Sequence, residues 1–337
     1  MSLTFTLPDG LEASGPPTVR DGVRLLVAHA GGIEHARFPQ LADFLSPGDL
    51  VVVNTSGTLP AAVDGTRADG RLVTVHFASA LDDGTWVVEI RPQEDASGPV
   101  SDGRIEDVVE LPDGVRLTLL APHPTGQSRL WRARIPIDGG VLGYLGKHGR
   151  PIRYGYVPVS LPIADYQTVF GREPGSAEMP SAGRPFTAEL VVELITRGIT
   201  LAPITLHTGV SSQDAGEPPQ PEPFRVPDTT ARAVNFTRAC GGRVIAVGTT
   251  VARALESAVD SDGIVRGKRG WTDLVLGPAR PAQVVTGLIT GWHAPGASHL
   301  NLLEAVAGQE LIRRAYDAAV RRRYLWHEFG DSCLLLP

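Results

Sequence analysis

Apolar and polar positions alternate along the chain in two ways, and each way predicts a different architecture. In the first 63 residues, and again from about residue 149, apolar strands alternate with amphipathic helices, which is typical of an α/β layer structure. The run DLVVVN (49–54) predicts a buried strand, and the segment 187–198 predicts a helix. We expect Thr187 to be the N-cap of this helix and Gly198 to end it.

The C-terminal half continues this alternation. Apolar runs predict strands over 199–209, 243–247 and 283–293, and the periodic run 301–324 predicts one long final helix. The stretch SSQDAGEPPQPEPF (211–224) is too rich in proline and polar residues for regular structure. It predicts a loop at a strand end, where binding residues often lie.

Between residues 64 and 148 the pattern changes to short β-prone runs separated by Asp-Gly turns, with no helix between them. Several strands at short, regular spacing predict a small antiparallel β-barrel, and Pro-Asp-Gly at 112–114 predicts one of its hairpins. We therefore expect an α/β main domain interrupted by an inserted small antiparallel β-barrel domain. The discontinuous α/β catalytic domain is expected to comprise 1–63 plus 149–337, and the barrel 64–148.

Composition limits the class of protein. Apolar residues make up 42% of the 337 residues and charged residues 20%, as in a globular enzyme with a large core. No stretch approaches the roughly 18 apolar residues of a membrane helix, and the N-terminus does not resemble a signal peptide. Cys240 and Cys333 match no zinc spacing, so we expect a cytoplasmic protein with no metal and no membrane contact. We expect a monomer. The net charge of −6 argues mildly against extensive RNA binding.

Two turns are candidates for a binding site. The strand RVIAV enters a helix through Gly248, Thr249 and Thr250, and free N–H groups at such a helix start attract a carboxylate, while the hydroxyls suit a ribose. Routine helix capping is the alternative. PSAGRPFT (180–187) also leads into a helix, and Gly183 allows close approach of a backbone there.

Histidines mark further strand ends. His207 ends the strand before the proline-rich loop, while His293 and His299 flank the loop before the final helix. Ligands tend to bind at this edge of α/β sheets, although a structural role remains the alternative for each histidine. The arginines between 313 and 323 predict either a solvated helix face or a phosphate-binding patch.

Taken together, these stretches resemble one family, the S-adenosylmethionine:tRNA ribosyltransferase-isomerases of queuosine synthesis. The resemblance spans nearly the whole chain, in order. Its pieces are LSPGDLVVVN with LPA (45–61), DYQTVF (165–170), GSAEMPSAGRPFT (175–187), ITLHTG (204–209), EPFRV (222–226), RVIAVGTTVARALES (243–257), LITGWHAPGASHLNLLEAVAG (288–308), AY (315–316) and FGDSCLLL (329–336).

The resemblance implies an enzyme that uses S-adenosylmethionine as a ribosyl donor and co-substrate. The acceptor in the family is the aminomethyl group of a 7-deazaguanine base in tRNA, and adenine and methionine leave. The candidates for proton transfer are His207, Glu222 and His293, and Tyr166 and Phe186 are candidates to stack on a base. The expected substrate-binding residues are Asn54, Tyr166, Gln167, Pro180, Ala182, Gly183, Arg184, Phe186, Thr187, Gly209, Gly248, Thr249, Thr250, Thr290, Trp292 and Ser298.

The chain also departs from the family pattern. Thr55, Gly57 and Ala62 stand where the family has an aspartate and two arginines, and Pro185 replaces a histidine. Arginine holds anions through several hydrogen bonds that glycine or alanine cannot make, so these losses and the negative charge put tRNA as the partner in question. New polar side chains, including Arg184, Trp292, His299 and Glu328, indicate a different ligand. Two alternatives to the queuosine function therefore stay open. One is a paralogue that uses S-adenosylmethionine with a different, possibly small-molecule acceptor or only cleaves it, and the other is a non-catalytic nucleoside-binding protein.

Overall fold

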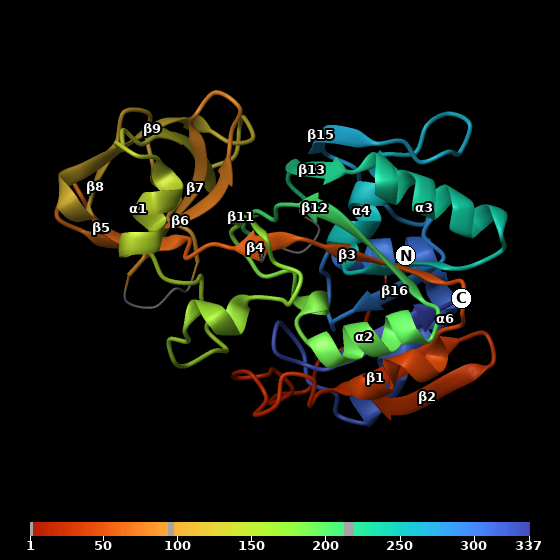
Figure 1. Cartoon of the computed structure of the whole chain (residues 1–337). Helices are drawn as coiled ribbons and strands as arrows, with labels where there is room; N and C mark the ends of the chain where they lie inside the picture. Colours follow the sequence, from red (N-terminus) through yellow and green to blue (C-terminus); the bar gives the residue numbers. More distant parts are fainter. Residues whose placement is uncertain (1–2, 94–97, 212–218) are drawn as a thin grey trace.

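Two separate sheets organise the chain, and the computed structural model describes residues 3–93, 98–211 and 219–337 of it. Figure 1 shows a β-barrel on one side and a larger layered domain on the other. This arrangement confirms the predicted α/β domain interrupted by a small antiparallel barrel. The predicted loop 211–224 lies largely outside the described residues, because only 211 and 219–224 are described.

The barrel closes from six antiparallel strands, so it has no exposed sheet edge. The Pro-Asp-Gly turn joins β8 to β9 as a hairpin, which confirms that prediction. Asp113 and Gly114 both have positive φ there, +59° and +71°, which suits the tight reversal. In order around the barrel, the strands are β10 (Leu130–Arg134), β7 (Trp86–Pro92), β6 (Leu72–Ala80), β5 (Ala62–Arg67), β8 (Val108–Leu111) and β9 (Val115–Pro122).

The large domain contains a nine-stranded mixed sheet. Its four central strands, β12, β3, β14 and β16, are parallel, and β17 runs antiparallel to β16. Across the sheet, the strands are β15 (Lys268–Thr272), β13 (Glu222–Val226), β12 (Thr200–Leu206), β3 (Leu50–Asn54), β14 (Val244–Val247), β16 (Gly287–Thr290), β17 (Ser332–Leu336), β1 (Arg24–His29) and β2 (Gly32–Arg37).

Helices cover both faces of this sheet because its central strands are apolar on both sides. On β14, Val244 and Ala246 join the core beneath one set of helices, while Ile245 and Val247 join the core on the other face. The first face carries α3 (Asp228–Ala239), α4 (Thr249–Ser257), α5 (His299–Ala307) and α6 (Gln309–Arg321). The second face carries the 3-10 turn η1 (Phe38–Phe44) and α2 (Ala188–Thr196).

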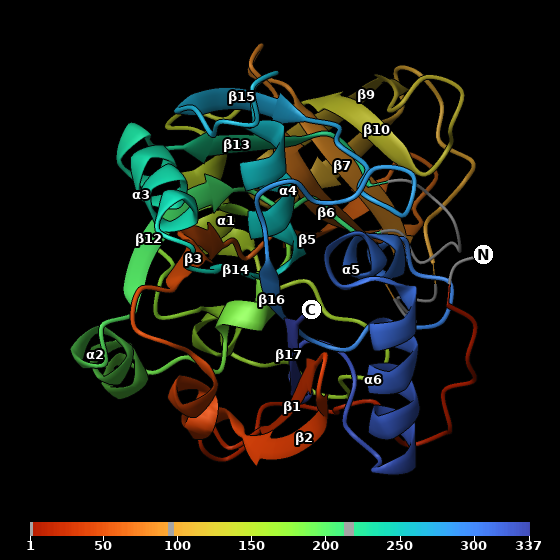
Figure 2. The same cartoon turned by 90° about the vertical axis from the view of Figure 1, so that its right-hand side faces the viewer.

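The helix boundaries follow local chemistry. The Thr187 side chain accepts a hydrogen bond from the Leu190 N–H, as predicted for the N-cap of α2. The prediction of one helix over 301–324 is wrong, since α5 ends at Ala307 and α6 begins at Gln309. Gly308 between them has φ +75° and ψ 152°, a conformation essentially restricted to glycine. Figure 2 shows the consequence: α5 is seen end-on beside the upright α6.

Two short strands connect the domains. The chain leaves the sheet through β4 (Ser56–Thr58) and returns through β11 (Glu173–Ser176), and these strands pair in parallel as a two-stranded ribbon. They lie between the two domains in Figure 1. On the return path, the chain forms α1 (Val141–His148) against the barrel and the 3-10 turn η3 (Ile163–Tyr166).

Candidate functional site

A cavity of about 500 Å³ opens at the carboxyl ends of β12, β14 and β16. Parallel α/β sheets generally bind ligands at this edge. The segment before β17 reaches the same edge because β17 runs antiparallel to β16. The barrel contributes Arg129, so the cavity lies where the two domains meet. Its volume is in the range of small-molecule sites, about 300–1,000 Å³.

The Gly-Thr-Thr corner forms one wall of the cavity. Gly248 occupies the N-cap position of α4 with φ +92°, and as a glycine it has no side chain to cap the helix start. A Cβ at Gly248 would lie 3.4 Å from the Cβ of Ala182, so the glycine also permits close packing of the 180–183 turn. Thr249 and Thr250, the first residues of α4, line the cavity and bring their hydroxyls and the N–H groups of the helix start to it. The helix start can therefore bind an anionic or hydroxyl group of a ligand.

A buried ion pair forms a second wall. Glu222 and Arg253 are hydrogen-bonded, and their side chains are only 13% and 7% exposed. Arg253 also donates to the carbonyl oxygens of Leu274 and Thr272, each at 3.1 Å, and Glu222 accepts the Gly209 N–H at 3.1 Å. Burial raises the pKa of Glu222, against the opposing effect of Arg253. This carboxyl is thus held firmly in place inside the cavity.

Two histidines stack in the third wall. The rings of His293 and His299 are parallel within 2°, with centroids 4.5 Å apart. Burial lowers the pKa of both, that of His299 to about 4, so both rings are neutral near pH 7. Thr290 Oγ1 lies 3.1 Å from Nε2 of His293, and the Trp326 indole donates to the His293 carbonyl. A neutral imidazole held in this way can accept a proton.

A cluster of carboxyl and phenol groups completes the cavity. The Tyr154 hydroxyl and both the N–H and hydroxyl of Ser211 donate to Glu178. The ring of Tyr156 stacks on His327 with centroids 4.1 Å apart. Burial raises the pKa of Glu178, and it raises that of Glu328 to about 7. Glu178, at the start of the 178–182 segment, lines a small adjoining space with Tyr154 and Glu328, while Ala182 at its end packs against Gly248 of α4.

The structure brings eleven of the predicted site residues to this cavity. They come from five separate segments of the chain, and they include two of the three candidates for proton transfer. The eleven are Pro180, Ala182, Gly209, Glu222, Gly248, Thr249, Thr250, Thr290, Trp292, His293 and Ser298.

His207, the third candidate, does not line the cavity. Its Nδ1 lies 2.7 Å from Ser56 Oγ, which in turn lies 2.6 Å from Ser176 Oγ. A Cβ at Gly175 would come within 2.4 Å of the imidazole, so the ring fills the space against the β4–β11 ribbon. The position of His207 therefore fits a role in joining the domains.

Seven further predicted residues also lie outside the cavity lining. Asn54 bridges strands by bonding the backbone of Leu206, and Gln167 bonds the backbone of Thr58. Phe186 is fully buried, and its ring centroid lies 5.2 Å from those of both Phe38 and Phe170, so no base can stack on it. The others are Tyr166 against Phe329, Gly183 beside Thr168, Arg184 bonded to the Asp165 carbonyl, and the helix cap Thr187.

Several cavity residues were not predicted from the sequence. Arg129 belongs to the barrel, Tyr154 and Tyr156 follow α1, and Glu178 follows β11. None of them ends a strand of the central sheet, which was the signal used. Arg253 lies one helical turn after Thr249, and that spacing on the α4 face could have identified it.

Within the described ranges, the structure contains no cluster of three His, Cys, Asp or Glu side chains able to hold a metal ion. None of the helices in the same part of the chain combines the length and apolar character that a membrane span requires.

Comparison with known proteins gives matches over almost the full length. A family model described as queuosine biosynthesis protein matches residues 1–335. An S-adenosylmethionine:tRNA ribosyltransferase-isomerase of Symbiobacterium thermophilum is 36% identical over 98% of both chains, and one of Moorella thermoacetica is 35% identical over the same shares. The crystal structure of an S-adenosylmethionine tRNA ribosyltransferase from Thermotoga maritima superposes with a TM-score of 0.56 at 28% identity, covering 99% of each chain.

Proposed function

Because this chain belongs to the queuosine biosynthesis protein family, we propose that it is an S-adenosylmethionine-dependent tRNA ribosyltransferase-isomerase. In the proposed reaction, the donor ribose moves to the aminomethyl group of a 7-deazaguanine base in tRNA, and adenine and methionine leave. S-Adenosylmethionine is thus a co-substrate that is consumed, and the protein supplies binding, orientation and proton transfer.

One observation carries the proposal. The Gly-Thr-Thr corner at the start of α4 and the His293 loop after β16 line the same cavity, although Thr250 and His293 are 43 positions apart in the sequence. A nucleoside with an amino-acid tail needs such a combination: amides and hydroxyls for its carboxylate or ribose, and a base near the reacting carbon.

The residues of the cavity suit the chemistry. A sulfonium acidifies the adjacent ribose C5′–H because it stabilises negative charge beside it, so a positioned base can remove that proton. Glu222 and His293 are the two predicted candidates that reach the cavity. His293 is neutral and buried, and Glu222 is bound to Arg253, so we assign the proton abstraction to His293. Glu222 would position Arg253 and the Gly209 amide.

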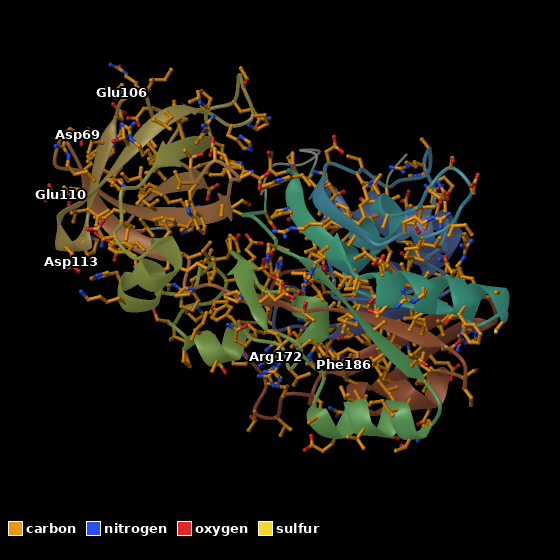
Figure 3. All side chains as sticks on the ribbon, turned by 45° about the horizontal axis from the view of Figure 1, so that its top comes forward. Asp69, Glu106, Glu110, Asp113, Arg172 and Phe186 are labelled. Carbon is orange, nitrogen blue, oxygen red and sulfur yellow. The ribbon has the colours of Figure 1, made fainter. Side chains whose placement is uncertain are left out.

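A second acceptor class has its own supporting observation. Arg129 and Arg253 line the cavity, and each already pairs with a carboxylate, Glu89 and Glu222 respectively. The outer end of the barrel carries Asp69, Glu106, Glu110 and Asp113, all pointing away from the α/β domain in Figure 3. Asp69 pairs with Arg71 and Asp113 with Lys147, so this end of the barrel carries mixed charge and is not a basic patch. It gives a phosphate backbone little attraction, and a small-molecule acceptor is the second candidate.

The experiment is to incubate the protein with S-adenosylmethionine, with and without tRNA that carries the aminomethyl base, and to measure free adenine and methionine. Release that depends on this tRNA supports the proposed function. Release without tRNA supports a small acceptor or cleavage alone. If neither product forms while calorimetry shows donor binding, the protein is a nucleoside-binding protein and the enzyme proposal fails.

A further inference from the structure

We propose that Glu328, supported by Glu178, forms a subsite for an organic cation inside the cavity. The inference rests on the proposed function, because the donor carries two positive charges, a sulfonium and an α-ammonium group. The inference adds Glu328 to the residues of the proposed site. It also predicts that these carboxylates let the cavity distinguish a charged donor from its neutral analogues.

The position of Glu328 carries the inference. It lies four residues before β17, and its side chain lines both the main cavity and a small adjoining space that it shares with Glu178, Tyr154 and Tyr166. Its Oε2 atom is buried and has no hydrogen-bond partner among the described residues. A buried oxygen without a partner is costly, so its presence at a cavity wall indicates a group supplied by a ligand.

The charges around the cavity point to the sign of that group. Three carboxylates, Glu178, Glu222 and Glu328, line it together with Arg129 and Arg253. Arg129 pairs with Glu89 and Arg253 with Glu222, and within the described part of the chain no salt bridge reaches Glu178 or Glu328.

The neighbouring histidines do not supply the missing charge. Burial lowers the pKa of His293, His299 and His327, so these rings are neutral near pH 7. Glu178 accepts hydrogen bonds from Tyr154 and Ser211, and the Tyr156 hydroxyl bonds to Glu328, but Oε2 of Glu328 has no partner among the described residues. Burial and the neighbouring charge of Glu178 raise the pKa of Glu328 to about 7, and a cation of the ligand would compensate both carboxylates.

The test compares three nucleosides by calorimetry with the full-length protein. S-Adenosylmethionine carries both positive charges, S-adenosylhomocysteine keeps only the ammonium, and 5′-methylthioadenosine has neither. The variant is Glu328→Gln, which keeps the shape and removes the charge. Glu12→Gln is the matched control, since Glu12 contacts His327 at 3.2 Å from outside the cavity.

We expect Glu328→Gln to weaken binding of the charged ligand about tenfold to a hundredfold, as for loss of a hydrogen bond to a charged group, with 5′-methylthioadenosine unaffected. If Glu328→Gln binds only S-adenosylmethionine more weakly, the bound cation is the sulfonium. If it binds S-adenosylhomocysteine more weakly as well, the bound cation is the ammonium. Equal weakening of all three nucleosides, no weakening, or an equal effect of Glu12→Gln overturns the inference. If Glu328→Gln does not fold, Glu178→Gln is subjected to the same comparison and the same criteria.

These results are separable from those for the proposed function. A wild-type protein that shows the charge preference but releases no adenine with any acceptor loses the proposed function and keeps the cation subsite. A protein that turns over with modified tRNA, but whose Glu328→Gln variant binds all three nucleosides normally, keeps the function and loses the subsite. Wild-type protein that binds none of the three overturns the subsite for this donor.

Discussion

Replacing Arg253 by methionine would test whether the ion pair in the cavity holds the α/β domain together. Methionine keeps much of the apolar stem, so the change mainly removes the guanidinium. Four contacts are lost at once: the ion pair with Glu222 and the hydrogen bonds to the carbonyl oxygens of Gln220, Thr272 and Leu274. The remaining carboxylate of Glu222 would be buried without a counter-charge.

Breaking a buried pair from one side costs about 3–5 kcal/mol. For a domain of about 150–250 residues, each kcal/mol lowers Tm by about 2–4 °C, so Arg253→Met should lower the Tm of the α/β domain by on the order of 10 °C. The double variant Arg253→Met/Glu222→Gln should recover part of this loss. It no longer buries a charge, and the amide oxygen of the introduced glutamine can still accept the Gly209 N–H.

Differential scanning calorimetry at pH 7.5 measures these shifts. The control is Arg266→Met, which breaks a pair with Asp260 in which the arginine side chain is 63% exposed, and it should leave Tm almost unchanged. The loss in Arg253→Met should also shrink as pH falls. Without the guanidinium, the folded-state pKa of Glu222 rises further above its unfolded value, so the penalty is absent below the unfolded pKa and grows as pH rises to the folded one. Additive effects of Arg253→Met and Glu222→Gln, or a shift no larger than the control's, would refute this reasoning.

Three further predictions concern single residues. His293→Ala should lower the rate of adenine release by about 10²-fold or more if this imidazole takes the proton, and a near-wild-type rate in the same assay would remove it as the base. Gly308→Ala should destabilise the α/β domain by about 1–3 kcal/mol, measured by urea denaturation, because alanine strains the joint between α5 and α6; an unchanged midpoint would show that the joint relaxes freely. Glu89, buried in the barrel with Arg91 and Arg129, has its pKa lowered to about 2 although burial opposes this. Its contribution to the free energy of unfolding is therefore present above the unfolded pKa and lost as pH falls from about 4.5 toward 2. In Glu89→Gln, the stability of the barrel, followed by tryptophan fluorescence, should depend less on pH in this range. A loss of stability in acid as steep as that of the wild type would contradict the assignment.

Local patterns were sufficient for most elements of the fold. The hairpin at 112–114 and the cap at Thr187 depend on neighbouring residues alone, so the sequence could predict them. The break at Gly308 was missed because the apolar periodicity continues on both sides of it. One glycine inside a helical pattern does not reveal whether its φ is positive, and that choice is made by the packing of α5 on α6.

The site was predicted only as far as strand ends could indicate it. Thr208 and Gly209 line the cavity, while the adjacent His207 bonds Ser56. Successive residues of an extended chain point in opposite directions, and the sequence does not say which of them faces the ligand. Tyr154 and Glu178 were missed for another reason, since docking of the barrel connections against the sheet brings them there and no local pattern encodes that docking.

The ribbon of β4 and β11 has a mechanical consequence. Both covalent passages between the domains run side by side and are hydrogen-bonded to each other, so the barrel is tethered along one line instead of at two distant points. We expect rotation about the ribbon to be the softest movement of the barrel, opposed by the hydrogen bond from the Trp271 indole on β15 to Asp82 in the β6–β7 turn. His207 fills the space beside Gly175 and bonds to Ser56, so the residue after β12 contacts both strands of the ribbon. Because Arg129 belongs to the barrel and lines the cavity, we expect such a rotation to change the shape of the cavity and so the access of a ligand to it.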